Sequence, residues 1–270
     1  MRVAVVGHVE WIEFVRVDQV PARGEIVHAG EVWAEAAGGG AVAAVQLARL
    51  AGSSTLFTAV GDDELGRKVV PELERLGVTV HAAVRPEPQR RGFTYLDADG
   101  ERTITVIGER LGPRRSDDLP WEELAGADGV YFVSGDAEAV RAARAGRVLV
   151  ATARSLPVLK EANVMLDALV RSGSDEGERY RPGDLDPPPR LEVTTEGARG
   201  GTYSVAGGPV RRYEAVPLPG PVQDTYGAGD SFAAGLTFGL AQGLSAEGAL
   251  ALGARCGAEA LARRGAHGTY

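Results

Sequence analysis

The sequence DTYGAGDSFAAGL, residues 224–236, is the most informative stretch of the chain. Gly227, Ala228 and Gly229 carry almost no side chain, and the pattern after them predicts a helix. The first N–H groups of a helix have no partner within it, and together with the helix dipole they attract anions. Asp230 lies in the first turn and places a carboxylate beside this anion site. Such a pair suits phosphoryl transfer, because the amides hold charge and the carboxylate accepts a proton from the attacking hydroxyl.

A simpler explanation is that Asp230 caps the helix while the glycines allow close packing, because Asp is favoured at helix starts. The complete string, Asp-Thr-x-Gly-Ala-Gly-Asp followed by Phe-x-x-Gly, closely resembles the C-terminal signature of the ribokinase-like (PfkB) sugar kinases. The resemblance extends over residues 3–266 and implies transfer of the γ-phosphoryl group of ATP to a sugar hydroxyl. It implies that Asp230 binds the substrate hydroxyl as general base, and that the N–H groups of Gly227, Ala228 and Gly229 form the anion hole.

The second half of the chain alternates short apolar runs with helical patterns. The runs at residues 130–133, 148–151 and 191–195 are typical of buried strands, and helical patterns at 137–145 and 156–162 lie between them. This alternation predicts a mainly parallel sheet covered by helices on both faces. We therefore expect an α/β fold, a ribokinase-like three-layer sandwich that binds ligands at the carboxyl ends of its strands.

A small second sheet is expected from strand patterns outside this alternation. Two early segments alternate apolar and polar side chains, and residues 97–100, with the sequence DADG, predict a hairpin between two further strands. We expect these strands, within about residues 10–35 and 91–108, to form a β lid on a single domain of residues 1–270. The resemblance implies that this lid covers the sugar and that homodimers form through it.

Gly38 and Gly39 precede an alanine-rich helical pattern that ends at Gly52. Glycines there let a ligand or a strand approach the backbone closely, although tight packing of the helix on a sheet explains them equally well. The segment resembles the family's N-terminal signature, which implies that Gly38 and Gly39 bind the substrate. Val42 stands near the position where the family usually has Asn.

The remaining sugar contacts are expected from the end of the first strand and from the lid. Family members usually present an Asp shortly after the first strand, and here Glu10 or Glu13 is available. We favour Glu10 because it lies closest to the strand end. Arg102 falls in a segment that resembles the family's Gly-Glu-Arg, which implies a further substrate contact.

Residues 194–201, TTEGARGG, run from a strand end into a glycine-rich turn. Alone, this pattern is also typical of a plain hairpin turn. It resembles the family's Thr-x-Gly-x-x-Gly nucleotide loop, which implies that Thr195, Gly197 and Gly200 bind ATP. The amides of Gly227 and Gly229 would face the same nucleotide.

Asp175 and Glu178 hold the spacing of the Asn-x-x-Glu segment through which family members act on the magnesium bound to ATP. Mg²⁺ keeps most of its waters, so the resemblance implies contact through water. A solvated acidic loop is the alternative. The resemblance also implies a monovalent cation, K⁺, near Asp224 and Thr225.

The composition excludes several functional classes. The chain has 270 residues and a formal charge of −8, which argues against nucleic-acid binding. Its one cysteine provides neither a disulfide framework nor a Cys-based metal site. No run has the length of a membrane span or the features of a signal peptide. We therefore expect a cytoplasmic protein that binds a small sugar and ATP, and neither nucleic acid nor membrane.

Two alternatives stay open at this point. A nucleoside kinase or a 2-keto sugar acid kinase of the same fold would share the Asp230 chemistry and differ in its substrate contacts. A sugar- or nucleotide-binding relative without turnover is favoured by the replacements near Val42 and Asp175. The intact Gly-Ala-Gly-Asp string argues against it.

Overall fold

A nine-stranded sheet forms the middle of the computed structural model, which describes residues 1–268. From one edge to the other its strands are β13 (Arg211–Tyr213), β12 (Gly201–Val205), β11 (Leu191–Thr195), β10 (Ala168–Ser172), β9 (Val148–Thr152), β8 (Gly129–Phe132), β1 (Val3–Val6), β4 (Ser54–Gly61) and β5 (Val78–Arg85). Neighbouring strands from β11 to β5 run parallel, whereas β12 and β13 are added antiparallel. The sheet is therefore mainly parallel, as predicted.

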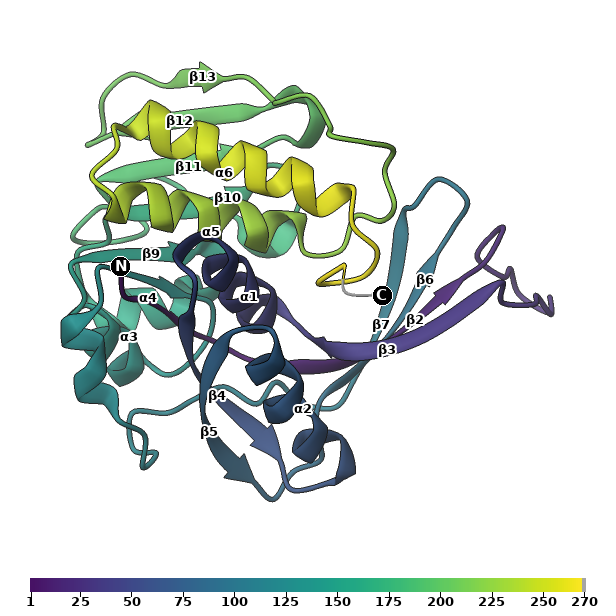
Figure 1. Ribbon diagram of the computed structural model, residues 1–270. Helices are drawn as coiled ribbons and strands as arrows, with labels where there is room; N and C mark the ends of the chain where they lie inside the picture. Colours follow the sequence, from purple (N-terminus) through teal and green to yellow (C-terminus); the bar gives the residue numbers. More distant parts are fainter. Residues whose placement is uncertain (269–270) are drawn as a thin grey trace.

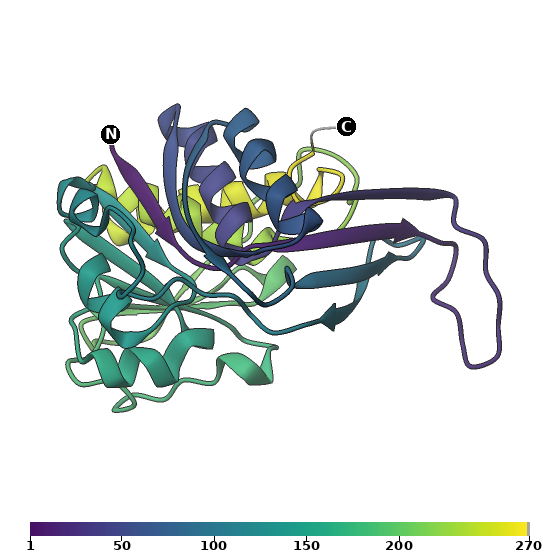
Figure 2. The same ribbon diagram turned by 90° about the horizontal axis from the view of Figure 1, so that it is seen from below.

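Helices cover both faces of this sheet (Figures 1 and 2). One face carries α1 (Gly39–Ala51), α2 (Glu64–Arg75), α5 (Ala228–Ala241) and α6 (Ala246–Leu261), and the other carries α3 (Ala137–Ala143) and α4 (Leu156–Ala162). The arrangement confirms the expected three-layer α/β sandwich.

The central strand β1 shows why the sandwich has a core on each side. Successive side chains of a strand point to opposite faces. Val3 and Val5 pack in the apolar cluster with α1, α5 and α6, whereas Ala4 and Val6 pack in the cluster with α3 and α4. A short run of apolar residues therefore supplies both cores, which is typical of a buried parallel strand.

A four-stranded sheet projects from the sandwich, as Figures 1 and 2 show. Its order is β3 (Glu31–Ala37), β2 (Glu10–Arg16), β6 (Arg91–Leu96) and β7 (Arg102–Ile107). The predicted hairpin between β6 and β7 is confirmed, with Gly100 at φ 78° and the Asp97 carboxylate accepting the Asp99 and Glu101 N–H groups. The sequence did not predict the parallel pairing of β2 with β6, which joins the two early strands to this hairpin.

The inner end of the four-stranded sheet packs on the loop that precedes α5. Ile12 and Phe14 of β2 are fully buried in an apolar cluster with Val42 and Tyr226, and the Phe14 and Tyr226 rings meet edge to face at 5.2 Å. Every residue of β7 is exposed. The sheet is therefore anchored at its base and faces solvent along its β7 edge.

Candidate active site

The start of α5 presents backbone amides that have no partner within the described chain. Gly227 precedes the helix in a left-handed conformation (φ 74°), and its carbonyl accepts a hydrogen bond from the Ser231 N–H at 2.9 Å. The N–H groups of Ala228 and Gly229 come before this bond and find no acceptor within residues 1–268. A Cβ added to Gly229 would meet no atom within 4 Å, so open space adjoins this turn. Donors of this kind suit an anion.

Asp230 places a carboxylate in this first turn. The side chain is half-buried, and within the described residues it makes no hydrogen bond or ion pair. Burial raises the pKa of Asp230 to about 6, the negative charge of Glu178 adds to the rise, and Arg102 and Arg154 oppose it. The Asp230 carboxyl group therefore titrates close to neutral pH and has no partner among the described residues. Both properties suit a general base.

The beginning of α1 lies directly against Asp230. A Cβ added to Gly39 would lie 2.9 Å from Asp230 Oδ1 and 3.0 Å from Val133 Cγ1. Gly38 has φ 86°, and its N–H donates to the Tyr226 hydroxyl at 3.0 Å. The two glycines expected at the substrate therefore bring α1 against the loop before α5 and against the candidate base.

Val42 has an apolar role at the position where the resemblance led us to expect Asn. It is buried, and a Cβ added to Gly227 would lie 2.8 Å from its Cγ1 atom. Val42 therefore packs against the turn that begins α5. Val42 cannot supply the polar contact that the usual Asn would make.

Glu10 lies at the beginning of β2, buried in a chain of polar contacts. Its Oε1 atom is 2.6 Å from Arg90 Nε and 3.6 Å from His8 Nε2, and the Nδ1 atom of His8 is 3.0 Å from the Ser134 hydroxyl. Burial raises the pKa of Glu10, although Arg90 and Arg110 oppose the rise. A Cβ added to Gly38 would lie 3.1 Å from Glu10 Cγ, so the backbone passes close to this side chain. Glu10, the residue expected to bind the sugar, thus lies near the site but is already paired with an arginine.

His8 is a buried residue of the site that the sequence analysis did not single out. It is buried, and its pKa is held well below the usual value by burial and by the charges of Arg110, Arg90 and Arg154. The imidazole is therefore neutral and can accept one hydrogen bond while donating another. Its place directly after the glycine that ends the first strand was the available signal, because ligands bind at such strand ends.

Arg102 lies against the loop before α5. Its guanidinium donates to the carbonyl of Thr225 and lies 5.7 Å from the centre of the Tyr226 ring. The Thr225 hydroxyl is buried and has no hydrogen-bond partner in the described part of the chain. Arg102 therefore already places a positive charge at the carbonyl of Thr225, one of the two residues expected near a monovalent cation.

Asp224 is fully buried and joins the loop before α5 to the segment after α6. Its two oxygens accept the N–H groups of Tyr226 at 2.8 Å and Gly265 at 2.5 Å. Burial raises its pKa to about 6, while these two hydrogen bonds oppose the rise. The neighbouring buried Glu35 similarly accepts the Ala266 N–H at 2.8 Å. Both oxygens of Asp224 are therefore occupied by the protein's own amides.

Asp175 and Glu178 are brought together, but by an arginine. Arg154, which follows β9, contacts Asp175 Oδ2 and lies 3.1 Å from Glu178 Oε1. The other oxygens accept the N–H groups of Gly177 at 2.8 Å and Ser172 at 2.7 Å. Because all four oxygens are engaged, the pair does not fit a directly bound metal ion. Within residues 1–268, no group of three or more His, Cys, Asp or Glu side chains could hold one.

The glycine-rich turn after β11 lies beside this acidic loop. The carbonyl of Thr195 accepts the Gly173 N–H at 2.8 Å, so both loops meet at the carboxyl ends of β10 and β11. Gly197 has φ 60° with open space beside it, whereas a Cβ on Gly200 would collide with the carbonyl of Tyr213. Gly200 is thus explained by the close approach of β13, and Gly197 leaves an exposed turn available to a ligand.

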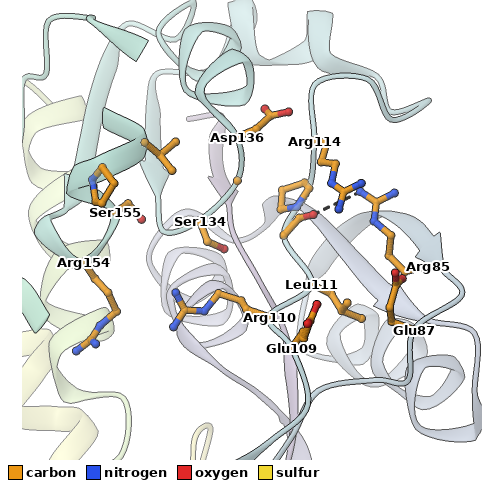
Figure 3. Close-up of a pocket in the computed structure, with 15 residues that line it drawn as sticks. Arg85, Glu87, Glu109, Arg110, Leu111, Arg114, Ser134, Asp136, Arg154 and Ser155 are labelled. Carbon is orange, nitrogen blue, oxygen red and sulfur yellow. Dashed lines mark hydrogen bonds between the residues drawn. The ribbon is translucent and has the colours of Figure 1, made fainter. Parts of the chain in front are cut away.

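A cleft of about 350 Å³ opens beside these elements, at the carboxyl ends of β5, β8 and β9 (Figure 3). Its lining includes Arg110, Arg154 and Ser134, and in Figure 3 the Arg110 side chain extends toward the side of the cleft that Arg154 occupies. Asp230 does not line this cleft. Val133 lies between Asp230 and the cleft. A Cβ added to Gly39 would contact both Asp230 and Val133, and Ser134, the residue after Val133, lines the cleft.

A mainly parallel α/β sandwich, with a second small sheet beside the carboxyl ends of its strands, is the architecture of the ribokinase-like kinases. Residues 1–171 and 189–269 match the family described as pfkB family carbohydrate kinase. The chain belongs to this family, whose members are ATP-dependent phosphotransferases that act on sugars.

Individual relatives agree with this assignment. The ATP-dependent ribose-1-phosphate kinase of Halopiger xanaduensis is 28% identical, with 98% of this chain and 94% of the relative covered. The structure of Thermotoga maritima ribokinase superposes with a TM-score of 0.77 at 21% identity, covering 98% of this chain and 94% of that one. Arabidopsis thaliana ribokinase complexed with ribose and ATP gives a TM-score of 0.75 at 20% identity, covering 97% and 93%. The fold is therefore shared along nearly the whole chain.

Helices that could cross a lipid bilayer are absent from the described residues, because none combines the required length and hydropathy.

Proposed function

We propose that the chain transfers the γ-phosphoryl group of ATP to a sugar hydroxyl with Asp230 as the general base. The observation that carries this proposal is the position of Asp230, whose half-buried carboxylate has no partner in the described chain and lies in the first turn of α5. Its pKa of about 6 supports the role, because the group is mostly ionised at neutral pH and still binds a proton readily.

In the proposed reaction, Asp230 accepts the proton of the sugar hydroxyl as the hydroxyl oxygen attacks the γ-phosphorus. The bond between that phosphorus and the β–γ bridging oxygen breaks and ADP leaves. The N–H groups of Gly227, Ala228 and Gly229 would hold the charge on the transferred group, because donors fixed in advance need no rearrangement during the reaction. Open space beside Gly229 supports this assignment.

We further propose that the turn containing Thr195, Gly197 and Gly200 contacts the nucleotide. Its place beside the acidic loop of Asp175 and Glu178 at one end of the sheet supports this. Mg²⁺ accompanies ATP in the proposed reaction, and contact with these carboxylates through water remains a prediction. A monovalent cation at Asp224 and Thr225 is also still a prediction.

On the acceptor side, we propose that the four-stranded sheet acts as a lid of a single ribokinase-like domain and that Glu10, Gly38, Gly39 and Arg102 lie at or near the sugar. The names of the Halopiger relative and of the Arabidopsis structure support a ribose-type acceptor. A homodimer through the lid is a prediction that the exposed β7 edge supports.

The test is the variant Asp230→Asn, which keeps the size of the side chain and removes the base. We expect kcat to fall by about 10²–10⁴, because that is the usual contribution of a positioned base, while the affinity for ATP stays unchanged. ADP release measures the rate and calorimetry measures nucleotide binding. Asp62→Asn is the control, because this exposed carboxylate pairs only with a nearby arginine and should leave both quantities intact. A near-normal rate in Asp230→Asn would refute the proposal.

A further inference from the structure

Tyr226, the third residue of the Asp-Thr-x-Gly-Ala-Gly-Asp string, is buried at the base of the four-stranded sheet, with 7% of its surface exposed. Its ring meets Phe14 edge to face and packs with Val42 in one apolar cluster. The guanidinium carbon of Arg102 lies over the ring, 5.7 Å from its centre. Because close packing on several sides restricts the ring, the hydroxyl group at its tip is held in one place.

The Tyr226 hydroxyl uses only part of its hydrogen-bonding capacity within the protein. It accepts the Gly38 N–H at 3.0 Å. A tyrosine hydroxyl also donates one hydrogen bond, but within residues 1–268 this hydroxyl donates to no acceptor. Burial and the charge of Glu10 raise the pKa of Tyr226, so the proton stays on the oxygen at neutral pH. Buried donors are nearly always paired, so the expected acceptor comes from outside the described chain.

This hydroxyl lies in the part of the site that is proposed for the sugar. Gly38, to which it is hydrogen-bonded, directly precedes Gly39, and a Cβ added to Gly39 would lie 2.9 Å from Asp230 Oδ1. A Cβ added to Gly38 would lie 3.1 Å from Glu10 Cγ. The charges of both Glu10 and Asp230 act on Tyr226. The unused donor is therefore beside both the residue expected to bind the sugar and the candidate base.

The position of Tyr226 favours the sugar over ATP as the partner of this donor. Its ring contacts Phe14 of β2, and its hydroxyl contacts Gly38 at the start of α1. The turns proposed for the nucleotide instead follow β10 and β11. Phenylalanine would fill the same apolar cluster, so packing alone does not explain the hydroxyl. A fixed neutral donor suits the hydroxyl and ring oxygens of a sugar, because a few placed polar groups set the orientation of a small ligand.

We propose that Tyr226 is a specificity-determining residue of the sugar site and that its hydroxyl donates a hydrogen bond to one oxygen of the acceptor sugar. The inference rests on the proposed function, which places the sugar beside Asp230. Gly38 acts on the sugar through Tyr226, because its N–H occupies a lone pair of the phenol oxygen and leaves the proton free for the ligand. A sugar that lacks an oxygen at this point leaves the donor unpaired, and sites of this kind reject such analogues.

The first experiment compares Tyr226→Phe with Tyr203→Phe as the matched control. Tyr203 is similarly buried, and its hydroxyl is bonded to Glu247 at 2.8 Å, so both variants keep a buried ring and lose one hydroxyl. Calorimetry measures the binding of whichever of D-ribose, D-fructose and D-glucose the unmodified protein binds most tightly. We expect Tyr226→Phe to weaken sugar binding about 10-fold, the size of one hydrogen bond, with ATP affinity within about twofold. Tyr203→Phe should leave both affinities near those of the unmodified protein.

The second experiment repeats these titrations with the monodeoxy analogues of the same sugar, each lacking one hydroxyl, and with the analogue whose ring oxygen is replaced by CH₂. The unmodified protein should bind one of these analogues about 10-fold more weakly than the parent sugar. Tyr226→Phe should bind that analogue and the parent sugar equally, because the contact is already absent. A site that is merely loosened would lose affinity for every analogue alike, so this pairing separates a contact with the sugar from a structural effect.

The outcomes separate this inference from the proposed function. An equal loss in Tyr226→Phe for the parent sugar and every analogue would overturn the inference, because the hydroxyl would then serve only Gly38. Binding of all the analogues within about twofold of the parent by the unmodified protein would also overturn it, even if the variant failed to fold. Neither result requires turnover. Sugar binding without ADP release would count against the proposed function, while the affinities would still decide the role of Tyr226.

Discussion

Replacing Gly39 by Ala tests whether the exact placement of Asp230 matters for the reaction. The added methyl group would lie 2.9 Å from Asp230 Oδ1 and 3.0 Å from Val133 Cγ1. Real Cβ atoms essentially never approach another atom closer than 3.0 Å, so something must move. Val133 packs in a buried cluster, whereas the Asp230 side chain is only half-buried. We expect the carboxylate to move.

The expected effect on folding is small and the expected effect on rate is large. Alanine in a helix is favoured over glycine by about 0.5–1 kcal/mol, which offsets much of the cost of moving a side chain by a few tenths of an ångström. Gly39 has no positive φ, so the backbone accepts alanine without strain. Because a misplacement of about 1 Å can cost about 10²-fold in rate, we expect kcat to fall about 10-fold.

The assay is steady-state ADP release, with the free energy of unfolding measured in urea on the same samples. Gly248→Ala is the control, because Gly248 also lies in the first turn of a helix and its added Cβ would make only an ordinary contact of 3.4 Å with Leu244. The control should keep its kcat and be equally or more stable. A kcat within about twofold of normal in Gly39→Ala would refute the argument that this contact positions the base.

Two predictions concern pH. With the pKa of Asp230 at about 6, kcat/KM should fall tenfold per pH unit below about pH 6 as the base is protonated, and a profile flat down to pH 5 would exclude Asp230. Burial raises the pKa of Glu35 from 4.5 to about 7, so the stability that its proton contributes is complete below about pH 4.5 and is lost as the pH rises through 7. In urea unfolding, Glu35→Gln should therefore lose less stability than the unmodified protein between pH 5 and 8, because glutamine still accepts the Ala266 N–H.

The architecture was predictable wherever local pattern decides structure. The apolar run that became β1, the turn at residues 97–100 and the start of α5 carry short-range signals, and the structure follows them. The parallel pairing of β2 with β6 joins segments about 80 residues apart and has no local signal. Pairings of this kind are decided by packing, here by the burial of Ile12 and Phe14.

The site was predictable in its backbone and less so in its charges. The small residues around Asp230 and Gly39 mark places where backbone and side chains approach closely, and a sequence displays such residues directly. The pairing of Asp175 and Glu178 with Arg154 joins residues more than 20 positions apart, and spacing alone does not reveal it. The same is true of the buried state of His8 and of the hydrogen bond between Gly38 and Tyr226.

The four-stranded sheet begins and ends at the site. Glu10 is the first residue of β2, Arg90 directly precedes β6, and Arg110 follows β7. Its far end, residues 18–30, is a loop that Figure 2 shows well away from the sandwich. Extra residues there would only lengthen a loop in solvent. One residue inserted near Glu10 would instead move the side chains of β2 to the opposite face of the sheet, so that Ile12 and Phe14 would point outward. Changes in the length of this sheet are therefore tolerable only at its tip.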